Sequence, residues 1–158
     1  MVSANGICWA NPALGHFTHR RDPMPAKALI RRPVIIPSAA ARTVLASETG
    51  SVFIVTSETV VQVLTLPRAA RSPVGTHFSF IYGASTAGTG SLDIVPESTA
   101  DTLLIKTRED AGTSIAPAAG TGVTNTSGSH VIGDHITLVS DGVSQWYMAG
   151  QSGLWASR

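Results

Sequence analysis

Short runs of strand-forming residues, separated by turn signals, constrain the fold of this chain most strongly. From residue 43 onward, β-branched and aromatic residues recur in segments such as SVFIVTS (51–57) and THFSFIY (76–82). In the second segment, Phe78, Phe80 and Tyr82 alternate with the residues of the opposite face, and this period of two is typical of a half-buried strand. Abundant Gly, Ala, Ser, Thr and Val suit short strands and turns rather than long solvated helices.

The same pattern along the chain predicts an all-β domain over residues 43–158. Strands are expected at 51–57, 59–66, 76–82, 91–95, 102–106, 135–140 and 143–148, the last two joined by a tight Asp141-Gly142 hairpin, with another turn at 150–153. Segment 112–129 is expected to form a long loop or a weak strand pair. A strand spacing of about 8–12 residues favours a small β-sandwich or barrel, jelly-roll-like, over a βαβ fold.

Residues 1–42 are expected to form an extended N-terminal arm. Three prolines within 24–42 fix φ and push the residues before them towards extended conformations. Residues 1–23 show no periodicity, and two interpretations of them stay open. They are either a native segment that is disordered unless a neighbour holds it, or an upstream translated extension ahead of a natural start at Met24.

Apolar anchors lie between the prolines of the arm and are interrupted by two arginines. The predicted partner-binding residues are Leu29, Ile30, Arg31, Arg32, Val34, Ile35 and Ile36. A segment of this kind fits an extended groove on another protein, where it adds strand-like hydrogen bonds and apolar pegs. The alternative is a strand and loop folded onto the chain's own domain.

Charge is scarce and unevenly distributed. Charged residues make up 13% of the chain, which is about half the usual share. Residues 1–42 carry six basic residues and one acid, whereas residues 43–158 carry five basic residues and nine acids. A basic tail on an acidic body is typical of a docking arm. A surface so poor in charge also favours burial against partners over a free monomer.

Residue types that carry catalysis or bind cofactors form no convincing motif. Cys8 is the sole cysteine, which excludes an intrachain disulfide and a multi-cysteine zinc site. The glycine-rich segment 83–90 lacks the Lys-Ser/Thr pair of a phosphate-binding loop. His130, Asp134 and His135 match no zinc motif, and we expect the two histidines at water-exposed loop or edge positions.

The remaining patterns argue against other function classes. The acids are scattered in turns, and the basic residues concentrate in the arm without interleaved aromatics, so neither general acid–base catalysis nor nucleic-acid binding is expected. No apolar run approaches the about 20 residues that span a membrane, and residues 1–15 do not have the pattern of a signal peptide. The sequence therefore predicts a protein that is not an enzyme, with no cofactor, metal, nucleic-acid or membrane partner.

The C-terminal stretch GDHITLVSDGVSQWYMAGQSGLW (133–155) resembles the closing hairpin of tailed-bacteriophage virion β-domains. In that group a Gly-Asp-x-Ile/Val-Thr-Leu-x-Ser-Asp-Gly strand and turn is followed by Trp-Tyr and a final Gly-x-Trp. Upstream, Leu66-Pro67, Pro73-Val-Gly75 and Phe78-Ser-Phe80 are similar to the same group. The resemblance covers roughly residues 43–155 and is a pattern of strands and turns without catalytic residues.

The resemblance implies a structural role on a virus particle, because the group includes capsid decoration (cement) proteins and parts of head or tail fibres. Many members are trimers. Positions in the core or at a subunit contact are accordingly expected for Phe78, Phe80, Trp146, Tyr147 and Trp155.

The leading hypothesis is a capsid decoration protein that binds the shell of the major capsid protein, as a homotrimer on the capsid surface, after synthesis in the host cytoplasm. The alternative is a head or tail fibre component whose β-domain binds a host receptor. A receptor-binding domain is expected to concentrate exposed aromatic residues in its loops. Segments 83–90 and 112–129 contain no aromatic residue, which favours the decoration protein. A third hypothesis, a carbohydrate-active enzyme domain, requires two carboxylates about 5–10 Å apart in a groove.

Overall fold

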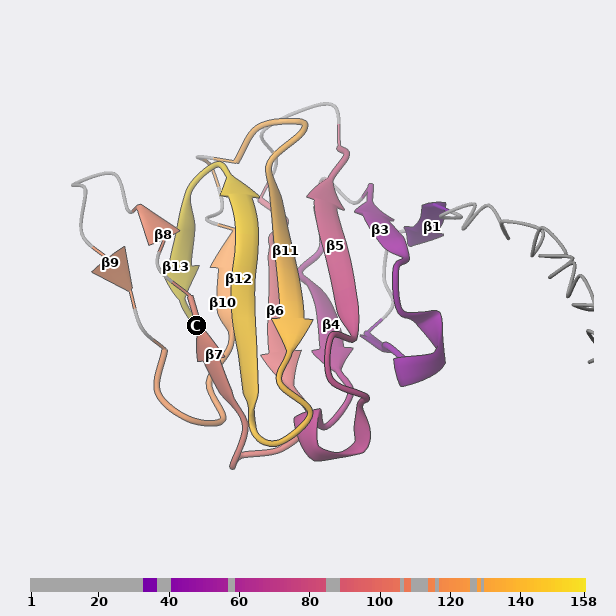
Figure 1. Cartoon of the computed structure of the whole chain (residues 1–158). Coiled ribbons are helices and arrows are strands. Elements are labelled where there is room, and N and C mark those ends of the chain that lie inside the picture. The colour runs from indigo at the N-terminus through magenta and orange to yellow at the C-terminus, as the bar shows by residue number, and fades with distance from the viewer. Residues whose placement is uncertain are drawn as a thin grey trace, which may run out of the picture.

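Two β-sheets packed face to face form the protein (Figure 1). The structure is a computed structural model that describes residues 33–36, 41–56, 59–84, 89–105, 107–108, 114–115, 117–125, 128 and 130–158. One sheet has six strands in the order β1-β3-β5-β11-β12-β7, and the other has five in the order β13-β10-β6-β4-β2. The predicted all-β sandwich is confirmed.

The strands are short, as the sequence pattern predicted. The six-stranded sheet consists of β1 (Pro33–Ile36), β3 (Val52–Val55), β5 (His77–Tyr82), β11 (His135–Ser140), β12 (Gln145–Ser152) and β7 (Thr102–Leu104). The five-stranded sheet consists of β13 (Trp155–Ser157), β10 (Val123–Asn125), β6 (Leu92–Pro96), β4 (Gln62–Leu66) and β2 (Arg42–Thr43). The other described elements are β8 (Thr107–Arg108) paired with β9 (Ser114–Ile115), and the 3-10 turns η1 (Ala46–Glu48) and η2 (Ala69–Arg71).

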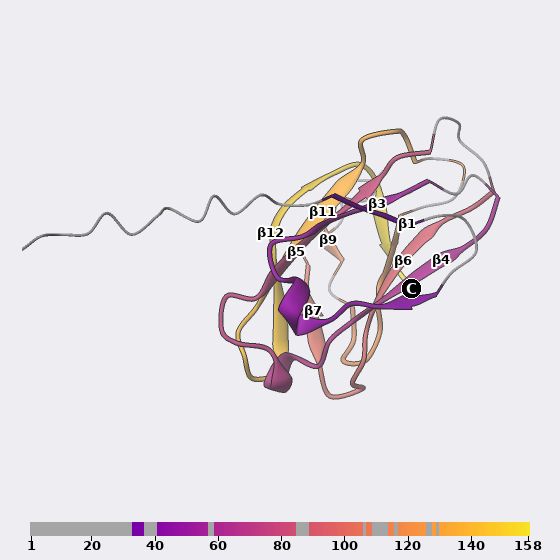
Figure 2. The same cartoon turned by 90° about the vertical axis from the view of Figure 1, so that its right-hand side faces the viewer.

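The chain alternates between the two sheets over its first six strands. β1, β3 and β5 are parallel neighbours in one sheet, and β2, β4 and β6 are parallel neighbours in the other. Between two neighbouring strands of one sheet, the chain forms a strand of the other sheet. That strand replaces the helix that usually connects a parallel pair. Figure 2 shows the two layers from the side. This mixed pairing differs from the antiparallel sheets of the jelly roll to which the sequence prediction likened the domain.

The later strands complete both sheets. β11 and β12 form an antiparallel hairpin beside β5, and β7 adds in parallel to the far side of β12. β10 lies between β6 and β13 and is antiparallel to both. Part of segment 112–129, expected as a loop or weak strand pair, therefore supplies an interior strand of the five-stranded sheet.

Aromatic side chains fill the core between the sheets. Phe53 stacks on Phe80 with ring centroids 5.4 Å apart, and Phe78 lies 5.7 Å from Trp146. These four side chains and Trp155 have no exposed surface. Phe78, Phe80, Trp146 and Trp155, expected in the core or at a subunit contact, are therefore core residues of this fold.

The packed domain includes residues that were expected in the arm, so the boundary at residue 43 is wrong. β1 pairs with β3 and β2 pairs with β4. Ile36 is buried and Val34 packs against the core, because a β-branched run completes the edge of a sheet well. For residues 33–36, the alternative interpretation is therefore the correct one: this segment is a strand folded onto the chain's own domain. The other predicted arm residues, Leu29, Ile30, Arg31 and Arg32, lie outside the described residues.

The C-terminal hairpin differs from its prediction in the loop. The return strand β12 begins at Gln145 and continues to Ser152, instead of covering 143–148. The Asp141 carboxylate accepts hydrogen bonds from three successive backbone N–H groups, those of residues 143–145, at 2.8–3.0 Å. This side chain stabilises a loop wider than the expected two-residue turn.

Candidate binding surfaces

The outward side of the six-stranded sheet, here called the outer face, is exposed to solvent among the described residues. Alternate residues of each strand point away from the core, and in Figure 1 no described strand or helix crosses in front of β5, β11 and β12. The outer face comprises Pro33, Ile35, Val52, Ile54, His77, Ser79, Ile81, Thr102, Leu104, His135, Thr137, Val139, Gln145, Tyr147, Gly150 and Ser152.

The described residues of the outer face include no Asp, Glu, Lys or Arg. Ile35, Ile54 and Ile81 are direct cross-strand neighbours in register, and His135 ends this row. Ile35 at the edge of the row is 65% exposed. An exposed apolar row of this kind is a candidate binding surface, since contact with it requires no desolvation of a charged group.

A second apolar group lies at the other side of the outer face. Tyr147 is 45% exposed and its register partner Leu104 is 38% exposed. Trp146 and Tyr147 are adjacent in one strand, so their side chains point to opposite faces, one into the core and one to solvent. Tyr147 alone of the expected core or subunit-contact residues is thus placed for a contact with another chain.

The outward side of the five-stranded sheet differs because it does carry charge. Asp93 on β6 forms an ion pair with Arg158, and the Asp93 Oδ2 and Arg158 Nε atoms are 2.8 Å apart. Ser91 also donates to Asp93 at 3.2 Å. Absence of charge therefore distinguishes the outer face of the six-stranded sheet from the described surface of the other sheet.

A second candidate surface is the turn before β11, where two large apolar side chains protrude. Val131 is 61% exposed and Ile132 is 65% exposed; we call these two residues the tip. The turn is closed by the Asp134 N–H, which donates to the Val131 carbonyl at 3.0 Å. Gly133 has a φ of +94°, a backbone conformation that glycine adopts without strain.

A buried polar scaffold supports the tip. The Asp134 carboxylate is 4% exposed and accepts hydrogen bonds from the Val131 N–H at 2.9 Å and from Asn125 Nδ2 at 3.2 Å. Asn125, fully buried on β10, also donates to the Leu154 carbonyl at 3.1 Å. A buried carboxylate costs free energy unless it is hydrogen-bonded. These bonds join the tip to β10 and to the turn before β13.

The end of β5 supports the same turn. The Tyr82 N–H donates to the Asp134 carbonyl and the Gly133 N–H donates to the Tyr82 carbonyl, both at 2.8 Å. His130 is 1% exposed and its ring centroid lies 4.1 Å from that of Tyr82. The expectation of a water-exposed His130 is therefore wrong, because the ring packs on an aromatic side chain that is distant in the sequence. His135 is half-buried on the outer face.

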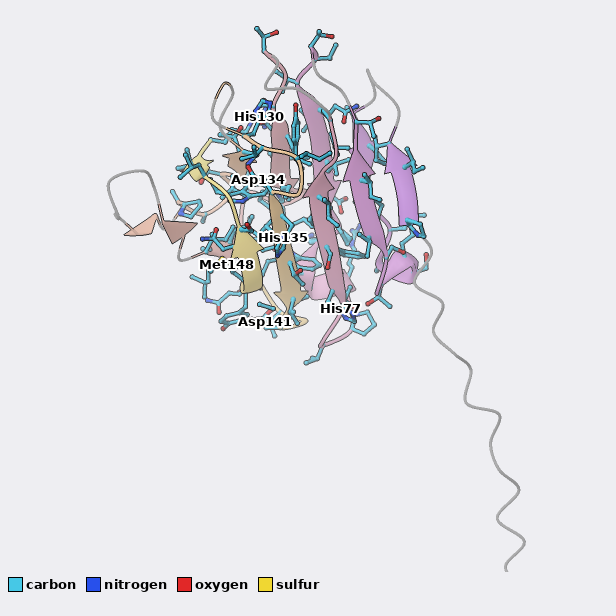
Figure 3. The ribbon with its side chains drawn as sticks, turned by 90° about the horizontal axis from the view of Figure 1, so that it is seen from above. His77, His130, Asp134, His135, Asp141 and Met148 are labelled. Carbon is cyan, nitrogen blue, oxygen red and sulfur yellow. The ribbon has the colours of Figure 1, made fainter. Side chains whose placement is uncertain are left out.

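The labelled side chains locate the tip within the fold. In Figure 3, His130 and Asp134 lie towards one end of the sandwich, while His77 and Asp141 lie towards the other. The tip precedes β11, and the Asp141 loop follows it. Val74 is next to that loop, since a Cβ at Gly142 would lie 2.8 Å from the Val74 Cγ2 atom. Val74 therefore marks the end opposite to the tip.

The acidic side chains of the described residues all make contacts within the fold. Glu48 forms an ion pair with Arg42 and Asp93 forms one with Arg158. The other four accept hydrogen bonds from backbone N–H groups: Glu97 from Arg68, Asp101 from Ala69, Asp134 from Val131, and Asp141 from residues 143–145. These carboxylates stabilise turns and sheet edges.

Two other kinds of site are absent from the part of the chain that the structure describes. Among the described residues, no group of three or more His, Cys, Asp or Glu side chains is arranged to hold a metal ion. Within those residues, no helix combines the length and apolar character needed to cross a membrane. Comparison with known proteins gave no matching family model and no matching curated protein.

Proposed function

We propose that this chain is a non-catalytic virion structural protein, a capsid decoration (cement) protein that binds the shell of the major capsid protein and stabilises the head. The observation that carries the proposal is the tip. Two large aliphatic side chains are held in water by a turn with a buried carboxylate, a buried amide and a positive-φ glycine beneath it. The sequence resemblance to virion β-domains supports the same class of function.

The physical argument concerns preorganisation. Full burial of one aliphatic side chain of this size is worth about 1.5–3 kcal/mol. A flexible loop would lose part of that gain in ordering its residues on binding. The turn at Val131–Asp134 is already fixed by backbone and side-chain hydrogen bonds. The tip is therefore suited to insert into an apolar pocket of another protein at little ordering cost.

Two further observations support binding rather than catalysis. The described carboxylates are separate from one another, and each stabilises a turn or a sheet edge, so no pair of them is arranged for general acid–base catalysis. The outer face offers apolar contact area instead of polar chemistry. For the arm, Leu29, Ile30, Arg31 and Arg32 remain the proposed contacts with neighbouring major capsid protein subunits. Val34 and Ile36 are not proposed as contacts, because Ile36 lies in the core and Val34 packs against it.

The test is binding of the full chain to shells of the major capsid protein from the virus that encodes it. We expect Ile132→Asp to weaken binding by about tenfold or more, because a charge replaces a side chain that is buried on docking. The matched control is Val74→Asp, a substitution at an 80% exposed residue on the opposite end, which should bind as the unsubstituted protein does. Co-sedimentation with shells measures both.

Equal binding by Ile132→Asp and the unsubstituted protein would remove the tip from the proposal. Failure of the unsubstituted protein to bind shells, with saturable binding to host cells, would favour the fibre alternative. Thermal unfolding of both variants checks that the substitutions leave the sandwich intact.

A further inference from the structure

We infer that the outer face is the surface by which two copies of this chain pack face to face, related by a twofold axis that lies between their six-stranded sheets. The strands of one copy cross those of the other at about 90°. The occupant of the outer face is thus a second copy of this chain. The inference goes beyond the proposed function, because it concerns the protein without a shell, and it differs from the homotrimer that the sequence resemblance implies.

Charge is the first argument for a second copy as the occupant. In a twofold contact the same surface lies on both sides, so a charged side chain near the axis meets its own counterpart. Like charges in contact are unfavourable. The described residues of the outer face include no Asp, Glu, Lys or Arg, so this repulsion does not arise. The outward side of the five-stranded sheet carries Asp93 and Arg158 and lacks this property.

Four polar side chains of the outer face already have hydrogen-bond partners within the same copy. Ser79 and Thr137 share a hydrogen bond of 2.9 Å between their hydroxyl oxygens. The Tyr147 hydroxyl donates to the side-chain oxygen of Gln145. A second copy can therefore cover these groups without leaving them unpaired.

The apolar side chains of the outer face form two groups at opposite sides of the sheet. The isoleucine row consists of Ile35, Ile54 and Ile81 on β1, β3 and β5. Tyr147 on β12 and Leu104 on β7 are register partners at the other side, and we call them the tyrosine pair. Both groups include an exposed side chain that a partner can cover.

The isoleucine row and the tyrosine pair also lie at opposite ends of the strands. Tyr147 pairs with Val139, and Val139 pairs with His77 of β5. In the same strand Ile81 is four residues further on, a distance of about 13 Å along the strand. The two apolar groups are therefore at diagonally opposite corners of the outer face.

This diagonal placement selects the crossing angle. A twofold axis parallel to the strands, or directly across them, lays each apolar group over a corner that contains neither group. An axis along a diagonal of the face lays the isoleucine row of one copy either on the tyrosine pair or on the isoleucine row of the other. A diagonal axis exchanges the strand direction with the direction across the sheet, so the two sheets cross at about 90°, a known class of sheet packing.

The size and outline of the outer face fit this arrangement. Six strands spaced by about 4.8 Å, with central strands of about 20 Å, give a nearly square footprint of roughly 500 Å². A square outline keeps its overlap when one copy is turned by a right angle. Two copies bury on the order of 1,000 Å² in total, the lower limit for a specific interface, and this suits a dimer that forms at micromolar concentrations.

Sedimentation velocity of the full chain tests the inference. We expect the unsubstituted protein to be a dimer at about 100 µM. The double variant Ile35→Lys with Tyr147→Lys sets cations of the two copies against each other and should be a monomer at the same concentration. The matched control is Val63→Lys with Thr65→Lys. Both residues are half-buried on the outward side of β4, in the other sheet, and this variant should remain a dimer.

A monomeric or trimeric unsubstituted protein overturns the inference, and so does an outer-face variant that stays dimeric or a control that dissociates equally. If the double lysine variant fails to fold, Ile35→Ser with Tyr147→Ser replaces it, and we expect at least about tenfold weaker dimerisation from the lost apolar burial. No shell is present, so failure of this inference and failure of the proposed function are distinguishable.

Cross-linking tests the crossing angle separately, in a Cys8→Ser background that removes the sole native cysteine. A short bismaleimide is added to Ile35→Cys alone, to a mixture of Ile35→Cys and Tyr147→Cys chains, and to a mixture of Ile35→Cys and Ser152→Cys chains. We expect a cross-linked dimer in the first or the second sample. Ser152 is at the same strand end as the isoleucine row, so a cross-link only in the third sample indicates aligned strands. That result, or no cross-link in any sample, overturns the crossing at about 90°.

Discussion

At the scale of single residues, Gly153 allows the carboxylate beneath the tip to occupy its position. Gly153 has a φ of +88°, and a Cβ atom built on it would lie 2.1 Å from Asp134 Cγ. Any side chain at this position would displace the carboxylate that accepts the Val131 N–H. The conformation of the turn that carries the tip therefore depends on a glycine in another loop.

We predict that Gly153→Ala lowers the free energy of unfolding by about 2–4 kcal/mol, because it combines a left-handed backbone conformation with steric overlap. Gly150→Ala is the control, since nothing lies within 4 Å of a Cβ there, and we expect a change below about 1 kcal/mol. Urea-induced unfolding measures both variants. Equal stability of the two would contradict the described role of Gly153.

Asp141, in the loop after β11, is expected to make the stability of the fold depend on pH. Burial by itself raises the pKa of Asp141, but hydrogen bonds from the N–H groups of Val143, Gln145 and Ser144 outweigh it, and the pKa of this carboxyl lies below its ordinary value. A carboxyl with a lowered pKa in the folded state contributes stability above its ordinary pKa of about 4. That contribution is lost as the pH falls through the lowered pKa.

Asp141→Asn should therefore reduce stability most above about pH 5, and the difference from the unsubstituted protein should shrink towards pH 2–3. Urea unfolding of both proteins across this pH range is the measurement. A difference that is constant with pH would show that ionisation of Asp141 does not stabilise the loop.

Sequence patterns predicted single-residue burial well where a strand alternates and poorly elsewhere. The alternation of β5 correctly predicted a shared face for Phe78, Phe80 and Tyr82. His130 lies outside any strand, so no period indicated that it packs on Tyr82. The grouping of Trp146 with Tyr147 overlooked that neighbours in a strand point to opposite faces.

At the scale of elements, β1 shows how an edge strand divides its side chains between two environments. Ile36 is buried in the core while its neighbour Ile35 is 65% exposed on the outer face. One short strand thus closes the sandwich and extends the apolar row of the outer face. The prolines predict an extended conformation, which β1 has. They do not indicate that β1 pairs with β3 in the six-stranded sheet.

We predict that Ile36→Ala lowers the free energy of unfolding by about 2–4 kcal/mol, the usual cost of truncating a buried isoleucine. Ile35→Ala, a neighbouring control at an exposed position, should change it by no more than about 0.5 kcal/mol. Chemical denaturation distinguishes them. Similar small effects for both would mean that β1 is not part of the packed domain in solution.

Strand positions were largely predictable at this scale, but their partners were not. Periodicity identifies which side chains share a face, and it found the strands at 76–82 and 135–140. Pairing depends on contacts between distant segments, so the parallel neighbours β1, β3 and β5 left no local signal. Segment 112–129 is rich in Gly, Ala, Ser and Thr, yet it supplies β10, an interior strand of the five-stranded sheet. The space beside β6 is narrow at Gly122, whose Cβ would lie 2.3 Å from the Ile94 carbonyl oxygen.

At the scale of the whole molecule, scarce charge was the most informative sequence feature. It suggested burial against partners, and among the described residues one sheet surface, the outer face, has no charged side chain. Neither candidate surface was identified from the sequence. The outer face can be identified only from the strand order, and the tip only from the fold of its turn, in which the Val131 N–H donates to the Asp134 carboxylate.

Electron cryomicroscopy of capsid shells saturated with the full chain tests the whole account most directly. We predict sandwiches bound at defined positions on the shell, with Ile132 of each copy against the major capsid protein. Shells that stay bare, or that carry single copies whose tips contact nothing, would contradict it.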